Sequence, residues 1–274
     1  MRTMEVLRSS LSSRLEILEC QPQIESPRPP VLFVHGAYAA AWTWAEHFMP
    51  HFAARGFPTY AVSLRGHGAS AGREALAWAS IADYVEDLGE AIDALDAPPV
   101  LVGHSMGAMV IMKHLERETA PAAVLIAPVP PHGLFPSSLM LALGRPGLFA
   151  ELNSLMSRGT ASVEAMQNAL FSGPLPVERL LDYYGRFQRE SQRAIWDMTL
   201  FNLPLAWRMN RPPMIALLAE RDLLFPLEAS RAGFTAIGVR AEVIEDTGHA
   251  VMLDRGWRQA ADRVVDWLAE QLPL

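Results

Sequence analysis

The serine at position 105 lies between two glycines, in the stretch GHSMG at residues 103–107. A serine hydroxyl becomes a nucleophile when a base takes its proton, and that base is usually a histidine held by a carboxylate. A Gly-x-Ser-x-Gly stretch presents such a serine when a strand precedes it and a helix follows. Here the apolar residues 99–102 precede it and GAMVIMKHLERE follows it. The pattern therefore predicts Ser105 as the nucleophile of a strand–turn–helix junction, rather than as part of an ordinary tight turn.

Among the eight histidines, His249 has the position expected of the base. It lies in EDTGHAVML, directly after an apolar run at residues 241–245, and functional sites are built in loops at the carboxyl ends of parallel strands. His47 and His51 are four residues apart and could face a metal ion from one helix, but no third ligand stands out. We therefore predict His249 as the general base and no metal site.

The carboxylate that orients His249 is expected after another strand, and ERDLLFP follows the apolar run at residues 214–219. This loop offers Glu220 and Asp222. We prefer Asp222 because it lies further into the loop and its shorter side chain is easier to hold in one geometry. Asp246 shares a loop with His249, and we interpret it as a cap or support of that loop. The order serine, aspartate, histidine is the one expected for this kind of site.

A negative charge that develops on a substrate oxygen needs two backbone N–H donors. The residue after the serine, Met106, should supply one. The second should come from the loop after an earlier strand, in VLFVHGAYAAAW at residues 31–42. Gly36 allows the backbone to turn there, so we predict the Ala37 N–H as the second donor, with Tyr38 as the alternative.

Continuous apolar runs predict strands that are buried on both faces of a parallel sheet. They lie at residues 31–34, 59–64, 99–103, 122–127, 214–219 and 241–245. Helical patterns alternate with them, at residues 80–95 with Ser80 and Asp83 as a capping pair, after Ser105, and at residues 258–272. This alternation predicts an α/β fold with a mostly parallel central sheet flanked by helices. The residues before Pro27, including LEILEC, should add one or two edge strands.

Residues 131–211 interrupt this alternation and carry no strand pattern. They read as short helices at residues 134–143, 151–158, 162–171, 177–190 and 191–201. We therefore predict a core domain formed by residues 1–130 and 212–274, and a helical cap, or lid, inserted at residues 131–211. The cap is rich in Met, Leu, Phe, Trp and Tyr. Most of these side chains should pack it onto the core, and a minority should line a cavity.

Composition limits the classes of partner. The 274 residues carry a formal net charge of −7 and no basic block, which argues against nucleic acid as a partner. Arg8 and Arg14 interrupt every candidate for a signal peptide, and no run reaches the ~18 apolar residues needed to span a bilayer. The single cysteine, Cys20, suits a reducing compartment. We therefore predict a cytoplasmic protein without integral membrane association, and leave its oligomeric state open.

Five stretches, in their order along the chain, resemble the α/β-hydrolase superfamily. HGAYAAAW is similar to the oxyanion loop of that family, and LRGHGAS to the loop after the next strand. GHSMG resembles the nucleophile elbow of monoacylglycerol lipases and esterases, while AERDLLFP and DTGHAVML resemble the acid and histidine loops. The resemblance implies acyl transfer to water without a metal or organic cofactor. Haloalkane dehalogenases and epoxide hydrolases of this fold carry an aspartate at the elbow, where this chain has Ser105.

The apolar, Met-rich cap predicts a small lipophilic substrate, because methionine surfaces adapt to varied shapes. We expect a carboxylic ester with a lipophilic acyl or alcohol part, such as a short- to medium-chain fatty acid ester or a monoacylglycerol. Two alternatives stay open. The same three side chains could serve a thioesterase or a hydrolase of carbon–carbon bonds, or the chain could be a non-catalytic small-molecule-binding protein on a hydrolase scaffold.

Overall fold

The computed structural model describes residues 14–24, 26–158 and 161–272, which form a seven-stranded sheet in the order β1-β3-β2-β4-β5-β6-β7. The strands are β1 (Glu16–Cys20), β2 (Val31–Val34), β3 (Thr59–Ser63), β4 (Val100–His104), β5 (Ala123–Ile126), β6 (Met214–Ala219) and β7 (Arg240–Ile244). Strand β1 runs antiparallel to β3, and every other neighbouring pair is parallel. The structure therefore confirms the mostly parallel sheet, with one edge strand from the residues before Pro27.

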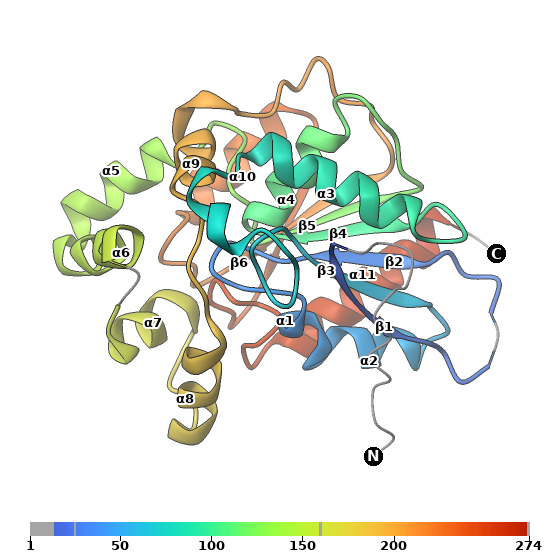
Figure 1. Ribbon diagram of the computed structural model, residues 1–274, viewed down its shortest axis with the longest axis horizontal. Coiled ribbons are helices and arrows are strands. Elements are labelled where there is room, and N and C mark those ends of the chain that lie inside the picture. Colours follow the sequence, from blue (N-terminus) through green and yellow to red (C-terminus); the bar gives the residue numbers. More distant parts are fainter. Residues whose placement is uncertain (1–13, 25, 159–160, 273–274) are drawn as a thin grey trace.

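Helices cover both faces of this sheet (Figure 1). One face carries α1 (Trp42–Ala45), α2 (Phe48–Ala53) and α11 (Trp257–Gln271). The other carries α3 (Ile81–Asp93), α4 (Met106–His114) and α10 (Leu227–Ala236). A 3₁₀ helix, η1 (Arg73–Trp78), precedes α3. Because both faces are covered, the inner strands β2, β4 and β5 are buried along their whole length, which explains their unbroken apolar runs.

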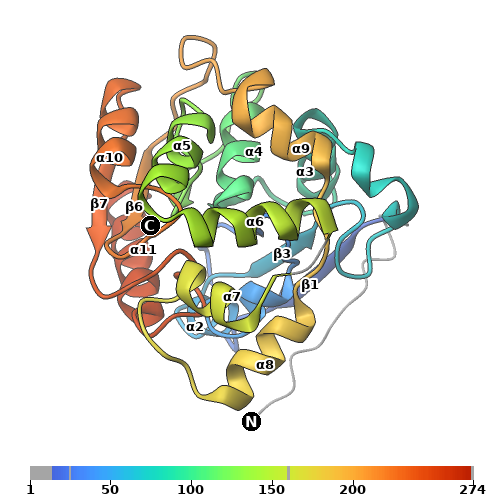
Figure 2. The same ribbon diagram turned by 90° about the vertical axis from the view of Figure 1, so that its left-hand side faces the viewer.

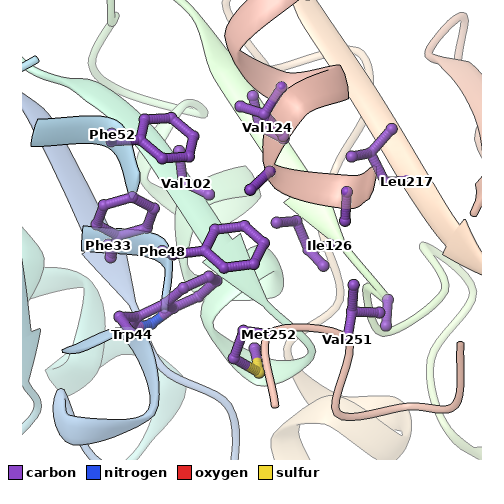
Figure 3. Packing of buried hydrophobic residues seen from close by; sticks show 14 of the residues in the cluster. Phe33, Trp44, Phe48, Phe52, Val102, Val124, Ile126, Leu217, Val251 and Met252 are labelled. Carbon is purple, nitrogen blue, oxygen red and sulfur yellow. The ribbon is translucent and has the colours of Figure 1, made fainter. Parts of the chain in front are cut away.

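The core on the α1, α2 and α11 face contains a group of aromatic side chains. Figure 3 shows Phe33 of β2 beside Trp44, Phe48 and Phe52 of the two short helices. The ring of Phe33 lies 4.8 Å from that of Trp44 and 5.4 Å from that of Phe52, the latter edge to face. Such ring pairs add to the stabilisation from apolar burial, so they fix these short helices on the sheet.

Helix α3 begins where its sequence indicates. Ser80 accepts a hydrogen bond from the Asp83 N–H, and the Asp83 side chain accepts one from the Ser80 N–H. This capping box satisfies two backbone donors that the first turn would otherwise leave unpaired. The predicted capping pair is confirmed, and Arg65, in the loop that follows β3, pairs with Asp83 at 2.7 Å.

The chain between β5 and β6, residues 127–213, is helical and is called the β5–β6 segment below. It contains α5 (Phe135–Gly144), α6 (Pro146–Arg158), α7 (Val163–Leu170), α8 (Val177–Arg186), α9 (Gln192–Trp196) and a π-helix, η2 (Asp197–Phe201). These helices gather at one side of the sheet (Figure 1), and Figure 2 shows α6, α7 and α8 in front of it. The described residues contain no helix long and apolar enough to cross a membrane.

The helix predicted over residues 177–190 is too long. Helix α8 ends at Arg186, and Phe187 is extended, with φ −67° and ψ 148°. The Gln188 N–H then donates to the Tyr38 carbonyl, 2.8 Å away, in the loop after β2. A hydrogen bond to a distant segment thus replaces the next helical one, so residues 187–191 form a connector rather than a last turn of α8.

Candidate active site

Ser105 lies at the turn between β4 and α4 in a backbone conformation that L-residues rarely adopt, with φ 51° and ψ −113°. Its glycine neighbours permit that turn. A Cβ at position 103 would lie 2.6 Å from the Gly107 carbonyl group, and a Cβ at position 107 would lie 2.4 Å from the Val34 carbonyl oxygen. Because these obstacles are backbone atoms, neither clash can be relieved by moving a side chain. The two glycines thus allow α4 to start against β2 while Ser105 projects from the turn.

The structure brings Ser105, His249 and Asp222 together. His249 Nε2 lies 3.0 Å from Ser105 Oγ, and its Nδ1 lies 2.8 Å from Asp222 Oδ2. Both partners of the imidazole are buried: Ser105 is 7% exposed, and the Asp222 side chain is 4% exposed. A carboxylate accepts hydrogen bonds and cannot donate them, so the Nδ1–H of His249 donates to Asp222. The Nε2 atom then presents its lone pair to the serine hydroxyl. This geometry allows proton transfer from Ser105 to His249.

Asp222 is held by the loop that follows β6. Its Oδ1 accepts the N–H groups of Leu224, at 2.8 Å, and of Phe225, at 3.1 Å. The Phe225 ring also lies edge to face on the imidazole of His249, with 5.0 Å between centroids. One carboxylate oxygen therefore fixes the loop while the other faces the imidazole, as expected of the shorter side chain.

Glu220 and Asp246 do not reach His249. The Glu220 side chain is 43% exposed and accepts the Asp246 N–H at 2.9 Å. The Asp246 carboxylate pairs with Arg221. The interpretation of Asp246 as a cap or support of the histidine loop stays a prediction: its carboxylate pairs with Arg221 of the loop after β6, and so links the two loops at the surface.

Two residues that sequence reasoning missed hold the histidine loop. Asp254 Oδ2 accepts the Gly248 N–H at 2.6 Å and the Ser172 N–H at 2.8 Å. His104 Nε2 donates to the carbonyl oxygen of His249 at 2.9 Å. Burial lowers the pKa of His104 well below its usual range, so its neutral ring remains a single donor. The signal for His104 was its place beside the predicted nucleophile.

The loop after β2 carries the predicted oxyanion donor. In the described residues, no hydrogen bond is donated by the Ala37 N–H or by the Met106 N–H at the start of α4. The Tyr38 N–H, the predicted alternative, donates to Glu190 Oε2 at 3.2 Å. Position 36 lies close to the serine, since a Cβ there would be 3.2 Å from the Ser105 Cβ. Ala37 and Met106 thus keep unengaged donors beside the turn, whereas Tyr38 does not.

A buried histidine orients the peptide that carries the Ala37 N–H. His35 Nδ1 donates to the Gly36 carbonyl oxygen at 2.8 Å, and its Nε2 accepts the Leu64 N–H at 3.0 Å. Burial and the neighbouring His67 lower the pKa of His35 to about 3, which keeps this donor–acceptor pattern across the neutral range. Because the C=O and N–H of a trans peptide point in opposite directions, holding the Gly36 oxygen aims the Ala37 N–H the other way.

His47 and His51 have partners of their own. The His47 ring stacks on Trp257, with 4.5 Å between centroids, and His51 Nε2 lies 2.8 Å from Asp262 Oδ1. Within the described parts of the chain, no group of three or more His, Cys, Asp or Glu side chains is arranged to hold a metal ion. These two histidines pack α2 against α11.

Most of the sequence matches that of a known protein family. Residues 31–267 match the sequence profile of the Alpha/beta hydrolase family. The chain belongs to this family. The match includes the turn at Ser105 and the loops of Asp222 and His249, so the predicted resemblance is confirmed at the level of the superfamily.

Individual relatives of this α/β hydrolase are distant but span most of its length. It is 25% identical to a monoacylglycerol lipase of Mycolicibacterium smegmatis, over 90% of each chain. The carboxylesterase CesB of Bacillus subtilis has a similar structure, with a TM-score of 0.69 and 20% identity over 93% of this chain and 88% of that one. A loop variant of the haloalkane dehalogenase DbeA from Bradyrhizobium elkanii also has a TM-score of 0.69, with 18% identity over 97% of both chains. The two structures share the fold with this chain.

Proposed function

We propose that this protein hydrolyses carboxylic esters through Ser105, His249 and Asp222, with an acyl-enzyme intermediate. The observation that carries the proposal is the pair of contacts of one imidazole, 3.0 Å to the serine hydroxyl and 2.8 Å to the carboxylate. An aspartate at the elbow would favour halide displacement, as the family resemblance implies. A serine in that place favours attack on a carbonyl carbon.

In the proposed reaction, Ser105 Oγ bonds to the carbonyl carbon while its proton passes to His249 Nε2. The carbonyl π electrons move to the oxygen, which the Ala37 and Met106 N–H groups stabilise. When the tetrahedral intermediate collapses, the bond to the alcohol oxygen breaks and the alcohol leaves with the proton from His249. Water, deprotonated by His249, then attacks the acyl carbon. The bond from that carbon to Ser105 Oγ breaks, Oγ takes the proton from His249, and the carboxylic acid is released. Asp222 remains ionised throughout and stabilises the imidazolium.

We further propose that residues 131–211 form a cap over this site and that the substrate carries a lipophilic acyl or alcohol part. Large apolar side chains are frequent in this region, and several are exposed, including Phe135, Leu143 and Trp196. The relative from Mycolicibacterium smegmatis is named as a monoacylglycerol lipase, which supports a fatty acyl ester as the substrate class. No cofactor enters this chemistry.

A labelling experiment tests the nucleophile. A fluorophosphonate probe should react with the wild-type protein and not with Ser105→Ala, because only an activated serine displaces its leaving group. Ser230→Ala is the matched control, since Ser230 is also buried but lies on α10, where its hydroxyl has no hydrogen-bond partner among the residues that the structure describes. An unlabelled wild-type protein would favour a binding protein on this scaffold.

A series of p-nitrophenyl esters tests the substrate class. We expect turnover to rise from the acetate towards the butyrate to octanoate esters, because each added methylene contributes about 0.8 kcal/mol when buried. The matched thioesters, run alongside, separate ester from thioester specificity. A protein that is labelled by the probe yet turns over none of these esters would instead favour a specialised substrate, such as one cleaved at a carbon–carbon bond.

A further inference from the structure

The connector between α8 and α9, residues 187–191, contacts the loop that carries the Ala37 donor. The Gln188 N–H donates to the Tyr38 carbonyl oxygen at 2.8 Å, and the Gln188 side chain accepts the Gly68 N–H at 3.1 Å. Two residues later, Glu190 Oε2 accepts the Tyr38 N–H at 3.2 Å. The backbone N–H and carbonyl groups of Tyr38 are therefore both bound by a segment that lies about 150 positions away in the sequence.

The carboxylate of Glu190 is completely buried and bound on both oxygens. Its Oε1 accepts the Tyr84 hydroxyl and the Ser191 N–H, each at 2.6 Å. Its Oε2 lies 3.2 Å from Nε2 of His67, whose side chain is also completely buried. This contact joins two buried ionisable side chains, so charge attraction strengthens it when His67 is protonated. A buried carboxylate with these partners has one position available to it, which makes it a rigid anchor.

The loop that this anchor holds is under strain. Tyr38 has a φ of 64°, in the left-handed region that favours glycine. A non-glycine residue keeps this backbone conformation only when surrounding contacts hold it there. Glu190 supplies the contact at the Tyr38 N–H, and His35 supplies the one at the Gly36 carbonyl, on the other side of Ala37. The two peptides that flank Ala37 are thus fixed from opposite sides, one by the core and one by the connector.

Packing alone does not fix the connector. A cavity of about 830 Å³ borders it, and Phe187, Gln188, Glu190 and Gln192 all contribute to the cavity wall. Open space on that side leaves room for the connector to shift if its polar contacts are lost. The hydrogen bonds to Tyr38 are the polar contacts that join the connector to the loop after β2, beside the packing of Phe187 on Trp42.

A second buried acid of the β5–β6 segment provides the comparison. Asp197 is 1% exposed, accepts the Ile81 N–H at 3.1 Å and pairs with Arg193. It joins the segment to the core as Glu190 does, but it contacts the start of α3 rather than the loop of Ala37. If Glu190 served only to attach the β5–β6 segment to the core, substitutions of Glu190 and of Asp197 should change kcat to the same extent.

We propose that Glu190 is a positioning residue for the reaction, because it holds the loop after β2 in the conformation that aims the Ala37 N–H at the developing oxyanion. This inference rests on the proposed function. The contact of Glu190 with the Tyr38 N–H would thus let the β5–β6 segment support catalysis as well as cover the site.

The test compares Glu190→Ala and Glu190→Gln with Asp197→Asn, using the ester that the wild-type protein turns over best. Removing an oxyanion donor costs on the order of 10²–10³ in kcat, and a displaced donor should cost somewhat less. We expect kcat to fall by about 10–100-fold in Glu190→Ala and by less in Glu190→Gln, which keeps an acceptor. KM should change by less than about threefold, since both acylation and deacylation form an oxyanion but substrate binding does not.

A second readout separates positioning from stability. A trifluoromethyl ketone forms a tetrahedral adduct with the serine, and its oxygen occupies the oxyanion position, whereas the matched methyl ketone binds without that charge. The affinity of the first should fall with kcat/KM in the Glu190 variants, while that of the second stays within about twofold. Asp197→Asn should lower the melting temperature and leave kcat and both affinities near wild type.

The outcomes distinguish this inference from the proposed function. If Glu190→Gln, which preserves shape, and Glu190→Ala both retain wild-type kcat and trifluoromethyl ketone affinity, Glu190 is not a positioning residue. Equal losses of kcat in the Glu190 variants and Asp197→Asn would also overturn the inference. A wild-type protein that neither reacts with the fluorophosphonate nor turns over esters would overturn the proposed function, and this inference with it.

Discussion

The sheet with its flanking helices and the β5–β6 segment bury their apolar residues to different extents. Strands β2, β4 and β5 are buried at every position. In the segment, by contrast, Leu143 is 79% exposed and Phe201 is 72% exposed. The side chains proposed to do the chemistry all come from the first region, at loops that follow its strands. The segment reaches the site through polar contacts to the backbone of those loops.

This difference indicates a division of roles. A region packed on both faces holds a strained turn such as that of Ser105 in place, because any relaxation would open the packing around it. The half-exposed helices of the segment hold less apolar surface against the core, and so they are freer to vary in position. The predictions below test this division, from the largest expected effect to the smallest.

Loss of the nucleophile or base should have the largest effect. Ser105→Ala and His249→Ala should each lower kcat by about 10⁵–10⁶-fold, because members of such a relay act as a unit. Circular dichroism and melting temperature should remain close to wild type, since neither change opens the core. Measurable turnover by Ser105→Ala at more than a hundredth of the wild-type rate would place the chemistry elsewhere.

Asp222→Asn should cost less, about 10⁴-fold in kcat, because it impairs the orientation and charge of His249 rather than the attack itself. Glu220→Gln is the matched control, a carboxylate on the same loop that contacts the Asp246 N–H and not the imidazole. It should retain nearly full activity. A dead Glu220→Gln beside an active Asp222→Asn would reverse the assignment of the acid.

Truncation of a core side chain should lower the free energy of unfolding, whereas truncation of an exposed side chain in the β5–β6 segment should leave it nearly unchanged. Phe33→Ala removes a fully buried ring that contacts Trp44 and Phe52, and should lower the free energy of unfolding by about 3–5 kcal/mol. Leu143→Ala, at an exposed position on α5, should change it by less than about 0.5 kcal/mol. Urea denaturation measures both. Similar losses would mean that the segment packs as tightly as the core.

The smallest effect concerns pH and the Glu190–His67 contact. Burial lowers the pKa of His67, but the charge of Glu190 and the hydrogen bonds that His67 makes outweigh it, so the pKa is raised above its usual value. The pair therefore stabilises the fold below about pH 6.5, and this contribution is lost as pH rises and His67 deprotonates. His67 lowers the pKa of Glu190 against burial, so the contribution is also lost in acid, as pH falls below about 4.5. The melting temperature of wild type should therefore exceed that of Glu190→Gln most between about pH 4.5 and 6.5. A gap that does not narrow above pH 8 would contradict this.

The elements of the sheet could be read from the sequence because their signals are local. Each of the six apolar runs overlaps an observed strand, and the capping pair at Ser80 marks the start of α3. The glycines around Ser105 likewise indicated a strand–turn–helix junction, which β4 and α4 form. In these places the residues that determine the structure are neighbours along the chain.

The remaining features depend on contacts between distant segments, which no local pattern reveals. The end of α8 at Arg186 follows from hydrogen bonds of the connector to Tyr38. The π-helix at Asp197–Phe201 continues α9 where a regular helix was expected. Helix α10 went unpredicted, as did the short helices α1 and α2 beside the loop after β2. The partners of Glu190, His104 and Asp254 became evident only once the fold placed them together.

The missing side chain at position 107 has one more consequence. Because α4 begins against the carbonyl groups of Val34 and His35, the turn of Ser105 packs directly on the backbone that leads into the loop of Ala37, and a Cβ at position 107 would not fit between them. Neither the turn of Ser105 nor the loop of Ala37 can shift towards the other without a backbone clash. If Ser105 attacks an ester, as proposed, a large substrate must therefore be accommodated by movement elsewhere in the molecule, while the serine hydroxyl and the N–H groups of Ala37 and Met106 keep their relative positions.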